Sequence, residues 1–170
     1  NLKIADPYSD LVLDPDHDQY IANQLQHLPA YPTGKTTGIL SVLNCDPVDY
    51  VWNNASFVRP HPMDLVIYEL LVRDFSVGHD YDTVLDSIDY FKRLGVNAIQ
   101  FLPLQESEGN STWVYNPSYH LALDKYYVRP EELKSLIDKR HAEGIAVILD
   151  VVLNHAFGQS PMVQLYFEQG

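Results

Sequence analysis

Three runs of apolar residues that follow Met63 predict three β-strands, of which the third is expected to be buried. They lie at residues 65–72, 97–103 and 145–149. Runs of Val, Ile and Leu without polar alternation are typical of strands covered on both faces, as in parallel sheets. The third run belongs to a longer stretch, 145–155, which also carries Asp150, Asn154 and His155. A buried aspartate costs several kcal/mol unless it has a partner, so this stretch indicates a functional position.

Two segments between these runs have the spacing of amphipathic helices. The first places Asp82 as a helix cap and Gly95 as the terminating residue, and its apolar stripe is Val84, Leu85, Ile88, Phe91 and Leu94. The second begins at Pro130 and ends at Gly144, and its stripe is Leu133, Leu136, Ile137 and Arg140. Strands and helices that alternate in this way predict parallel strands joined by right-handed crossovers. Three strands are too few for a closed barrel, so we expect an α/β chain that forms part of a larger fold.

Residues 1–63 differ from the rest of the chain. Pro, Asp, Asn and Tyr are frequent here, which indicates turns and extended pieces, and 38–43 is the one good strand candidate. We therefore expect two regions. Residues 1–63 would be a β-rich tail or linker, and residues 64–170 would carry the α/β elements.

The charge of the chain excludes two classes of partner. It has 23 acidic and 11 basic residues, a net charge of -12. Nucleic acids and anionic membrane surfaces would repel it. The chain also lacks an apolar run near the ~18 residues of a spanning helix. Its single cysteine, Cys45, excludes an intrachain disulfide.

Asp150, Asn154 and His155 are the first candidate site. The carboxyl ends of parallel strands are where α/β enzymes place their chemistry. His155 could donate to a ligand hydroxyl or act as an acid or base, and Asn154 could ligate a hard cation through its amide oxygen. The structural alternative is a capped strand whose polar residues bond to the next loop.

The long segment 104–129 is the second candidate, because it holds the aromatic stretch Trp113-Val-Tyr-Asn-Pro-Ser-Tyr119. Connections of this length are usually functional or disordered. Aromatic faces stack on the apolar faces of sugar rings at little entropic cost. The alternative is a small core packed beneath the loop.

Charged residues beside the first two strands favour structural interpretations. We expect Glu69, inside an apolar run, to form an ion pair with Arg73, its nearest basic neighbour. Glu106 and Glu108, which follow the second strand, are expected to be solvated.

Several of these segments together resemble the α-amylase superfamily of glycoside hydrolases. Asp150-Val-Val-Leu-Asn-His155 resembles its first signature, and Val66-Ile-Tyr-Glu-Leu-Leu-Val-Arg-Asp-Phe75 resembles its first barrel strand. Trp113-Val-Tyr-Asn-Pro117 is similar to a Trp-Gly-Tyr-Asn-Pro motif of branching-enzyme and pullulanase-like members, with Val114 in place of glycine. Ala5-Asp-Pro-Tyr8 and Val12-Leu-Asp-Pro15 are similar to the segment that joins an N-terminal β-sandwich to the barrel.

The resemblance implies a TIM (β/α)8 barrel that acts on α-glucans such as starch or glycogen, of which this chain would hold the first three βα units. It implies that His155 bonds the sugar at the cleavage point, that Tyr115 stacks under that sugar, and that Trp113 and Asn116 also contact substrate. Asp150 would orient the catalytic centre. Asn154 sits where many members bind a structural calcium, although no cofactor is required.

The resemblance also implies that the reacting groups lie elsewhere. The family's retaining mechanism uses two carboxyl groups about 5–5.5 Å apart. In the family these come from the fourth and fifth barrel strands, so we expect them beyond this portion, in the remainder of the barrel. Residues 1–170 alone would then be inactive. A glucan branching transferase within the family, a non-catalytic carbohydrate-binding protein and a nucleotide-binding α/β domain remain alternatives. The nucleotide-binding reading would want a glycine-rich turn after the first strand, where the chain has only Gly78.

Overall fold

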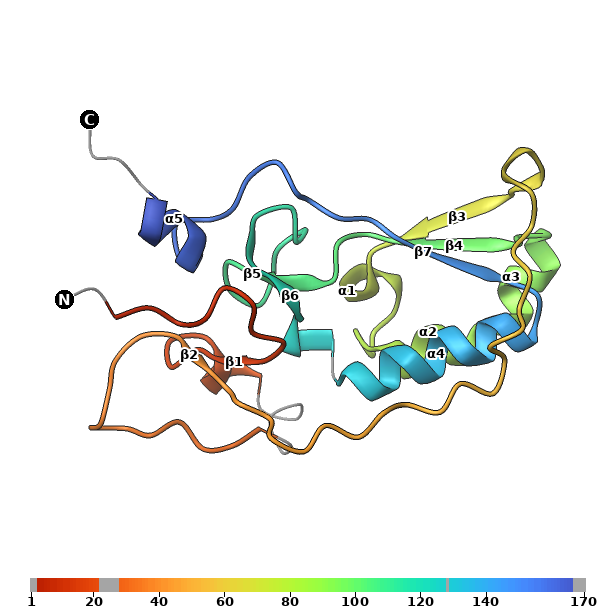
Figure 1. The fold of residues 1–170 in the computed structure, drawn as a ribbon. Coiled ribbons are helices and arrows are strands. Elements are labelled where there is room, and N and C mark those ends of the chain that lie inside the picture. The colour runs from red at the N-terminus through yellow and green to blue at the C-terminus, as the bar shows by residue number, and fades with distance from the viewer. Residues whose placement is uncertain (1–2, 22–27, 128, 167–170) are drawn as a thin grey trace. The chain divides into compact units, whose positions relative to one another are not determined.

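The computed structural model describes residues 3–21, 28–127 and 129–166, which form two compact units (Figure 1). The first unit comprises Asn1–Pro47, Gln105–Tyr126 and Val151–Gly170. The second comprises Val48–Leu104 and Tyr127–Asp150. Both units therefore combine segments that are far apart in sequence. The boundary at residue 63 stays a prediction about the longer domain organisation.

The second unit contains a parallel three-stranded sheet. Its strands, in spatial order, are β3 (Ile67–Leu70), β4 (Ala98–Phe101) and β7 (Ala146–Leu149). Ile67 aligns with Ala98, and Ala98 aligns with Ala146, so successive strands are neighbours in register. The predicted parallel arrangement of the three strands is confirmed.

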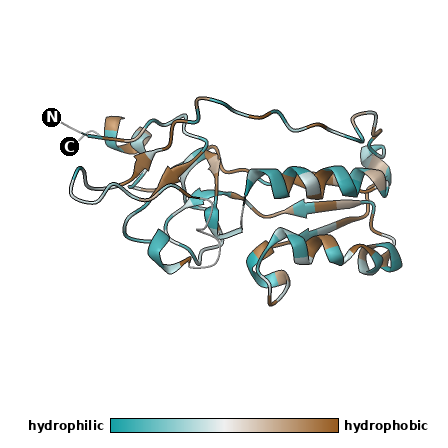
Figure 2. Ribbon diagram, turned by 90° about the horizontal axis from the view of Figure 1, so that it is seen from below, coloured by the Kyte–Doolittle hydropathy of each residue, from teal (hydrophilic) through white to brown (hydrophobic). Residues whose placement is uncertain are grey.

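Helices connect these strands. After β3 come α1 (Val72–Phe75), α2 (Tyr81–Asp86) and α3 (Ile88–Leu94), and α4 (Pro130–Ala142) precedes β7. Figure 2 shows hydrophobic colouring along the strands and alternating polar and hydrophobic turns along α4. The core of the unit includes Val84, Phe91, Ile99, Phe101 and Leu136. A short 3-10 turn, η3 (Pro62–Asp64), leads into β3.

The helix ends match the sequence only in part. Gly95 adopts φ 72° and Pro130 lies in the first turn of α4, as predicted. The cap of α2 is Asp80 rather than Asp82, because the Asp80 side chain accepts from the Thr83 amide at 2.9 Å. The expected single helix is also two helices, which meet at Ser87, whose hydroxyl donates to the Thr83 carbonyl.

Two predictions about burial and pairing in this unit are wrong. The third strand is not covered on both faces, since Leu149 is 47% exposed. Within the described residues β7 is an edge of the sheet, so one flank of the strand has no neighbouring strand. Glu69 does not pair with Arg73: Glu69 accepts from Gln100, whereas Arg73 forms a two-bond pair with Asp74, at 2.7 and 2.8 Å.

The first unit has little regular structure. An antiparallel pair joins β1 (Val12–Leu13) to β2 (Leu40–Ser41), which lies within the strand predicted at 38–43. A second pair joins β5 (Gln105–Ser107) to β6 (Pro117–Leu123), with register shifts on both sides of Glu106. The remaining elements are η1 (Asp18–Tyr20), α5 (Pro161–Tyr166) and most of η4 (Lys125–Tyr127), whose last residue belongs to the second unit.

A small apolar cluster holds the first unit together. Ala5, Val12, Tyr119 and Ala122 are buried in it, and Ile39 packs against them. The segment 104–129 thus contains a hairpin that shares an apolar cluster with the N-terminal region, so Tyr119 has the structural role considered for the aromatic residues. Among the described residues, none of the helices is long and apolar enough to cross a membrane.

Candidate functional site

The two motifs that the sequence singled out meet in the first unit. Nε2 of His155 lies 2.7 Å from the backbone oxygen of Tyr115, forty residues earlier in the chain. Since a carbonyl can only accept, the ring donates through Nε2. The Nδ1 atom of a neutral His155 is then an acceptor. Both side chains are exposed, so the imidazole of His155 and the aromatic ring of Tyr115 are both accessible to solvent in this part of the first unit.

The loop that carries Tyr115 is held by local polar contacts. The Thr112 hydroxyl accepts from the Val114 amide at 2.9 Å and lies 2.8 Å from the Ser107 hydroxyl. Asn116 donates to Glu108 at 2.6 Å. These bonds fix the backbone around Trp113, whose side chain is 61% exposed. The loop thus exposes the side chains of Trp113 and Tyr115, whereas the side-chain amide of Asn116 is hydrogen-bonded to Glu108 within the loop.

Val114 explains how the motif turns without a glycine. The residue has φ 60°, a left-handed conformation that a β-branched side chain rarely adopts. Its side chain is nevertheless buried, so packing holds the strained backbone in place. The position therefore has the conformation that glycine favours, although the sequence supplies valine.

Asp150 and Asn154 occupy different surroundings. Asp150 directly follows β7 in the second unit, and its amide donates to the Phe101 carbonyl at 3.0 Å, which extends the β-ladder. Asn154 belongs to the first unit and is exposed.

Asn154 and His155 line an open cavity of about 400 Å³ in the first unit. The other lining residues are Pro7, Tyr8, His120, Leu121, Leu153, Ala156 and Met162. Sequence reasoning missed Tyr8, His120 and Met162 as part of this site. They come from the N-terminal segment, β6 and α5, and no local pattern connects these segments.

The cavity does not suit a calcium ion. Calcium prefers six to eight oxygen ligands, with carboxylates among them. The lining offers the amide oxygen of Asn154 but no carboxylate. Within the described residues there is also no group of three His, Cys, Asp or Glu side chains placed to hold a metal. The prediction that Asn154 ligates a structural calcium gains no support here.

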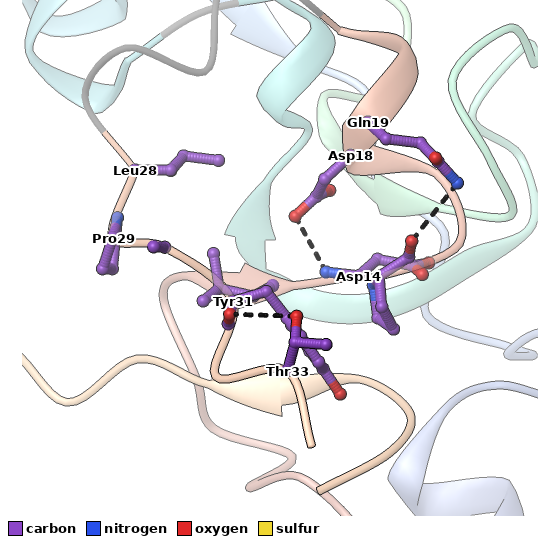
Figure 3. A pocket seen from close by; sticks show the side chains of 10 residues that line it. Asp14, Asp18, Gln19, Leu28, Pro29, Tyr31 and Thr33 are labelled. Carbon is purple, nitrogen blue, oxygen red and sulfur yellow. Dashed lines mark hydrogen bonds between the residues drawn. The ribbon is translucent and has the colours of Figure 1, made fainter. Parts of the chain in front are cut away.

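A second cavity, of about 320 Å³, lies over the N-terminal segment (Figure 3). Asp14, Asp18, Tyr31 and Thr33 line it, and none of the predicted site residues does. The Asp14 amide donates to the Asp18 carboxylate at 2.8 Å, and the Thr33 hydroxyl contacts the Tyr31 carbonyl. Some of the polar groups around this cavity thus bond within their own segment, and Asp18 also contacts Lys125.

The strongest electrostatic feature of the first unit is a buried charged cluster. Lys125, 3% exposed, contacts Glu106 at 2.5 Å and Asp18 at 3.2 Å. Asp124 and Asp14 are buried nearby. Burial opposes the charge of Lys125, but Glu106 and Asp18 outweigh it and raise the Lys125 pKa. Glu106, expected to be solvated, is instead part of this cluster.

The pKa values of the carboxyl groups in the cluster are raised, whereas an exposed ion pair lowers the pKa of its carboxyl group. Burial raises the pKa of Glu106, although Lys125 opposes the shift. Burial and the charge of Glu106 raise the pKa of Asp124 well above its ordinary value. The cluster lies away from the described contacts of His155, so we interpret it as structural.

Comparison with known proteins supports the resemblance found in the sequence. Residues 49–165 match the family described as the catalytic domain of alpha amylase. A malto-oligosyltrehalose trehalohydrolase from Saccharolobus solfataricus is 36% identical over 107 residues, 63% of this chain and 19% of that protein. The 1,4-alpha-glucan branching enzyme GlgB of Corynebacterium diphtheriae is 31% identical over 113 residues, 62% of this chain and 15% of that protein.

The fold also has a solved counterpart. A putative alpha amylase from Salmonella typhimurium superposes with a TM-score of 0.73 at 24% identity, over 96% of this chain and 24% of that one. The chain spans about a fifth of the length of the curated relatives it matches, between 18% and 19% for the first three.

Proposed function

Because the chain belongs to the alpha-amylase catalytic-domain family, we propose that it forms the first part of a (β/α)8 barrel that cleaves or transfers α-glucosidic bonds of starch-like or glycogen-like glucans. In this proposal the parallel strands β3, β4 and β7 are the first three barrel strands. The observation that carries it is the 2.7 Å contact between His155 and the Tyr115 carbonyl. It brings together the two motifs to which the family assigns the sugar at the cleavage point.

His155 and the aromatic side chains have separate roles in this proposal. His155 is held by Tyr115, so its ring has a fixed direction before substrate arrives, and this lowers the entropic cost of binding. Tyr115 and Trp113 offer exposed aromatic faces for the apolar faces of glucosyl rings. Asp150, at the end of β7, orients the catalytic centre. These residues bind and position the glucan.

The reaction itself would follow the retaining mechanism of the family. A carboxylate nucleophile forms a glycosyl-enzyme and a second carboxyl group donates the proton to the leaving oxygen, with the two groups about 5–5.5 Å apart. We propose that both groups lie on barrel strands that follow residue 170. Residues 1–170 then bind and orient substrate but perform neither covalent step.

Hydrolysis and transfer remain two outcomes of the same intermediate. The similar proteins include one named a trehalohydrolase and one named a branching enzyme. The water or sugar hydroxyl that attacks the glycosyl-enzyme decides between them. Product analysis of the enzyme that contains this segment separates the two: new reducing ends indicate hydrolysis, and new branch points without reducing ends indicate transfer.

The experiment that tests the proposal measures reducing sugar released from soluble starch by purified residues 1–170. We expect none above background, whereas the enzyme that contains this segment should act on the same starch. A His155→Ala sample prepared in parallel controls for a contaminating amylase, which would give equal activity in both samples. Release by residues 1–170 that the His155→Ala sample lacks would contradict the proposal.

A further inference from the structure

The cavity beside His155 has a composition that the proposed sugar contacts do not explain. Its nine lining residues include no Asp, Glu, Lys or Arg, although the chain as a whole carries 34 such residues. The lining instead combines apolar side chains with two histidines and one asparagine. Because none of the described lining residues is charged, the cavity suits a neutral molecule that has both apolar surface and hydroxyl or amide groups.

Tyr8 forms a wall of this cavity, and its side chain is 75% exposed. An exposed tyrosine ring costs free energy in water and becomes favourable when a flat apolar surface covers it. Tyr8 belongs to the Ala5-Asp-Pro-Tyr8 segment, for which the family resemblance implies only a connecting role. The cavity gives this segment a second role.

The backbone that presents Tyr8 is fixed before any ligand arrives. The Tyr8 amide donates to the Asp6 carboxylate at 2.9 Å, and the Ser41 hydroxyl accepts from the Asp6 amide at 2.7 Å. Ser9 and Ser41 also bond through their hydroxyls. Directly after the lining residue Ala156, the Phe157 amide donates to the Pro117 carbonyl at 2.9 Å. The segments that carry Tyr8 and Ala156 are therefore anchored to strands of the first unit, β2 and β6.

We propose that this cavity is a further glucosyl subsite, adjoining the sugar that His155 contacts, in which Tyr8 stacks on the ring. His120 and Asn154 bond its hydroxyls, and Leu121 and Met162 complete the apolar wall. This inference rests on the proposed function, because the neutral occupant is taken to be the next unit of the same glucan. The continuity of the cavity with His155 favours that occupant over an unrelated neutral ligand.

The test measures the dissociation constant for maltoheptaose in the enzyme that contains this segment, by titration calorimetry at low temperature. We expect Tyr8→Ala to weaken binding about three- to tenfold, since stacking of this kind contributes ~0.5–1.5 kcal/mol. Tyr8→Phe should bind as the unsubstituted enzyme does, because the ring is kept. The loss should diminish for maltotriose, which is too short to occupy every subsite.

Tyr20→Ala is the matched control, because Tyr20 is 73% exposed in the same unit but does not line the cavity. Unchanged maltoheptaose binding by Tyr8→Ala overturns the subsite. So does a lower melting temperature without weaker binding, which would mean that another protein segment fills the cavity. If the unsubstituted enzyme binds no α-glucan at all, the proposed function itself fails, so the two failures are distinguishable.

Discussion

Two buried carboxylate sites, one in each unit, are stabilised in opposite ways. In the first unit, Glu106 shares the cation of Lys125 with Asp18, beside the buried Asp124. In the second unit, Asp138 has no ion pair among the described contacts: it accepts from the backbone and side-chain amides of Asn53 and Asn54, at 2.8–3.1 Å. The first site depends on one charge, and the second on several neutral donors.

The two environments move the carboxyl pKa values in opposite directions. The amides of Asn53, opposed by burial, and then those of Asn54 lower the pKa of Asp138 to about 2. Burial raises the pKa of both Glu106 and Asp124 despite Lys125. Amide donors that point at a carboxylate thus stabilise its charge better than one lysine shared among several acids. The comparison predicts that the two units respond differently to mutation and to pH.

The largest expected effect comes from Lys125→Met. The substitution keeps the length of the side chain but leaves Glu106 and Asp18 buried without a cation. Breaking a buried pair in this way costs about 3–5 kcal/mol. The chain has two tryptophans, Trp113 in the first unit and Trp52 in the second, so urea unfolding can be followed separately in Trp52→Phe and Trp113→Phe backgrounds.

We expect Lys125→Met to destabilise the transition reported by Trp113 much more than the one reported by Trp52. Lys35→Met, which removes an exposed lysine of the same unit, is the control and should change neither transition. An equal loss of stability in both transitions would mean that the two units unfold together. The difference between the two carboxylate sites would then have no separate effect on stability.

The next largest effect is that lowering the pH should change the stability contributions of the two carboxylate sites in opposite directions. Asp138 has a lowered pKa, so its contribution is present above its ordinary value of 3.8 and is lost as the pH falls toward about 2. Glu106 and Asp124 have raised pKa values, so their contribution is present at low pH and decreases as the pH rises through their folded-state values. Between pH 4 and 2 the urea concentration at the midpoint of the transition reported by Trp52 should therefore fall.

Asp138→Asn is the control for this pH dependence. The variant has no carboxyl group at position 138 to titrate, so the loss of stability of the second unit between pH 4 and 2 should become smaller. An unchanged acid profile in Asp138→Asn would assign that loss to other carboxyl groups.

The smallest expected effect concerns Val114, in the loop between β5 and β6. Glycine at this position relieves the strain of φ 60°, which partly offsets the lost burial of the valine. Val12, equally buried in β1, has no such strain to relieve. We expect Val114→Gly to cost about 1–2 kcal/mol less than Val12→Gly in urea unfolding. Equal costs would show that the Val114 backbone is unstrained.

The sequence predicted the second unit better than the first, for a physical reason. The strands β3, β4 and β7 are local apolar runs, and Gly95 ends its helix through its own backbone freedom. The site at Lys125 depends on the hairpin of β5 and β6. This hairpin brings Glu106 into contact with Lys125, which follows it by nineteen residues in the sequence. No periodic pattern encodes that pairing, so Glu106 was expected to be solvated.

The candidate site shows the same division. His155 and Tyr115 were found because each lies in a recognisable motif, and the structure adds the contact between them. Tyr8 was not found as a site residue, because its relation to His155 exists only after three distant segments have packed. The wrong partner for Glu69 has a similar origin, since Arg73 lies in α1 and turns toward Asp74.

The most direct test of the account is the effect of His155→Ala on maltoheptaose binding by the enzyme that contains this segment. Loss of one well-placed hydrogen bond to the sugar should weaken binding about tenfold. His61→Ala removes an exposed histidine of the second unit and should leave the dissociation constant within about twofold. Equal dissociation constants for His155→Ala and the unsubstituted enzyme would contradict the central claim that His155 and Tyr115 form a glucan-binding site.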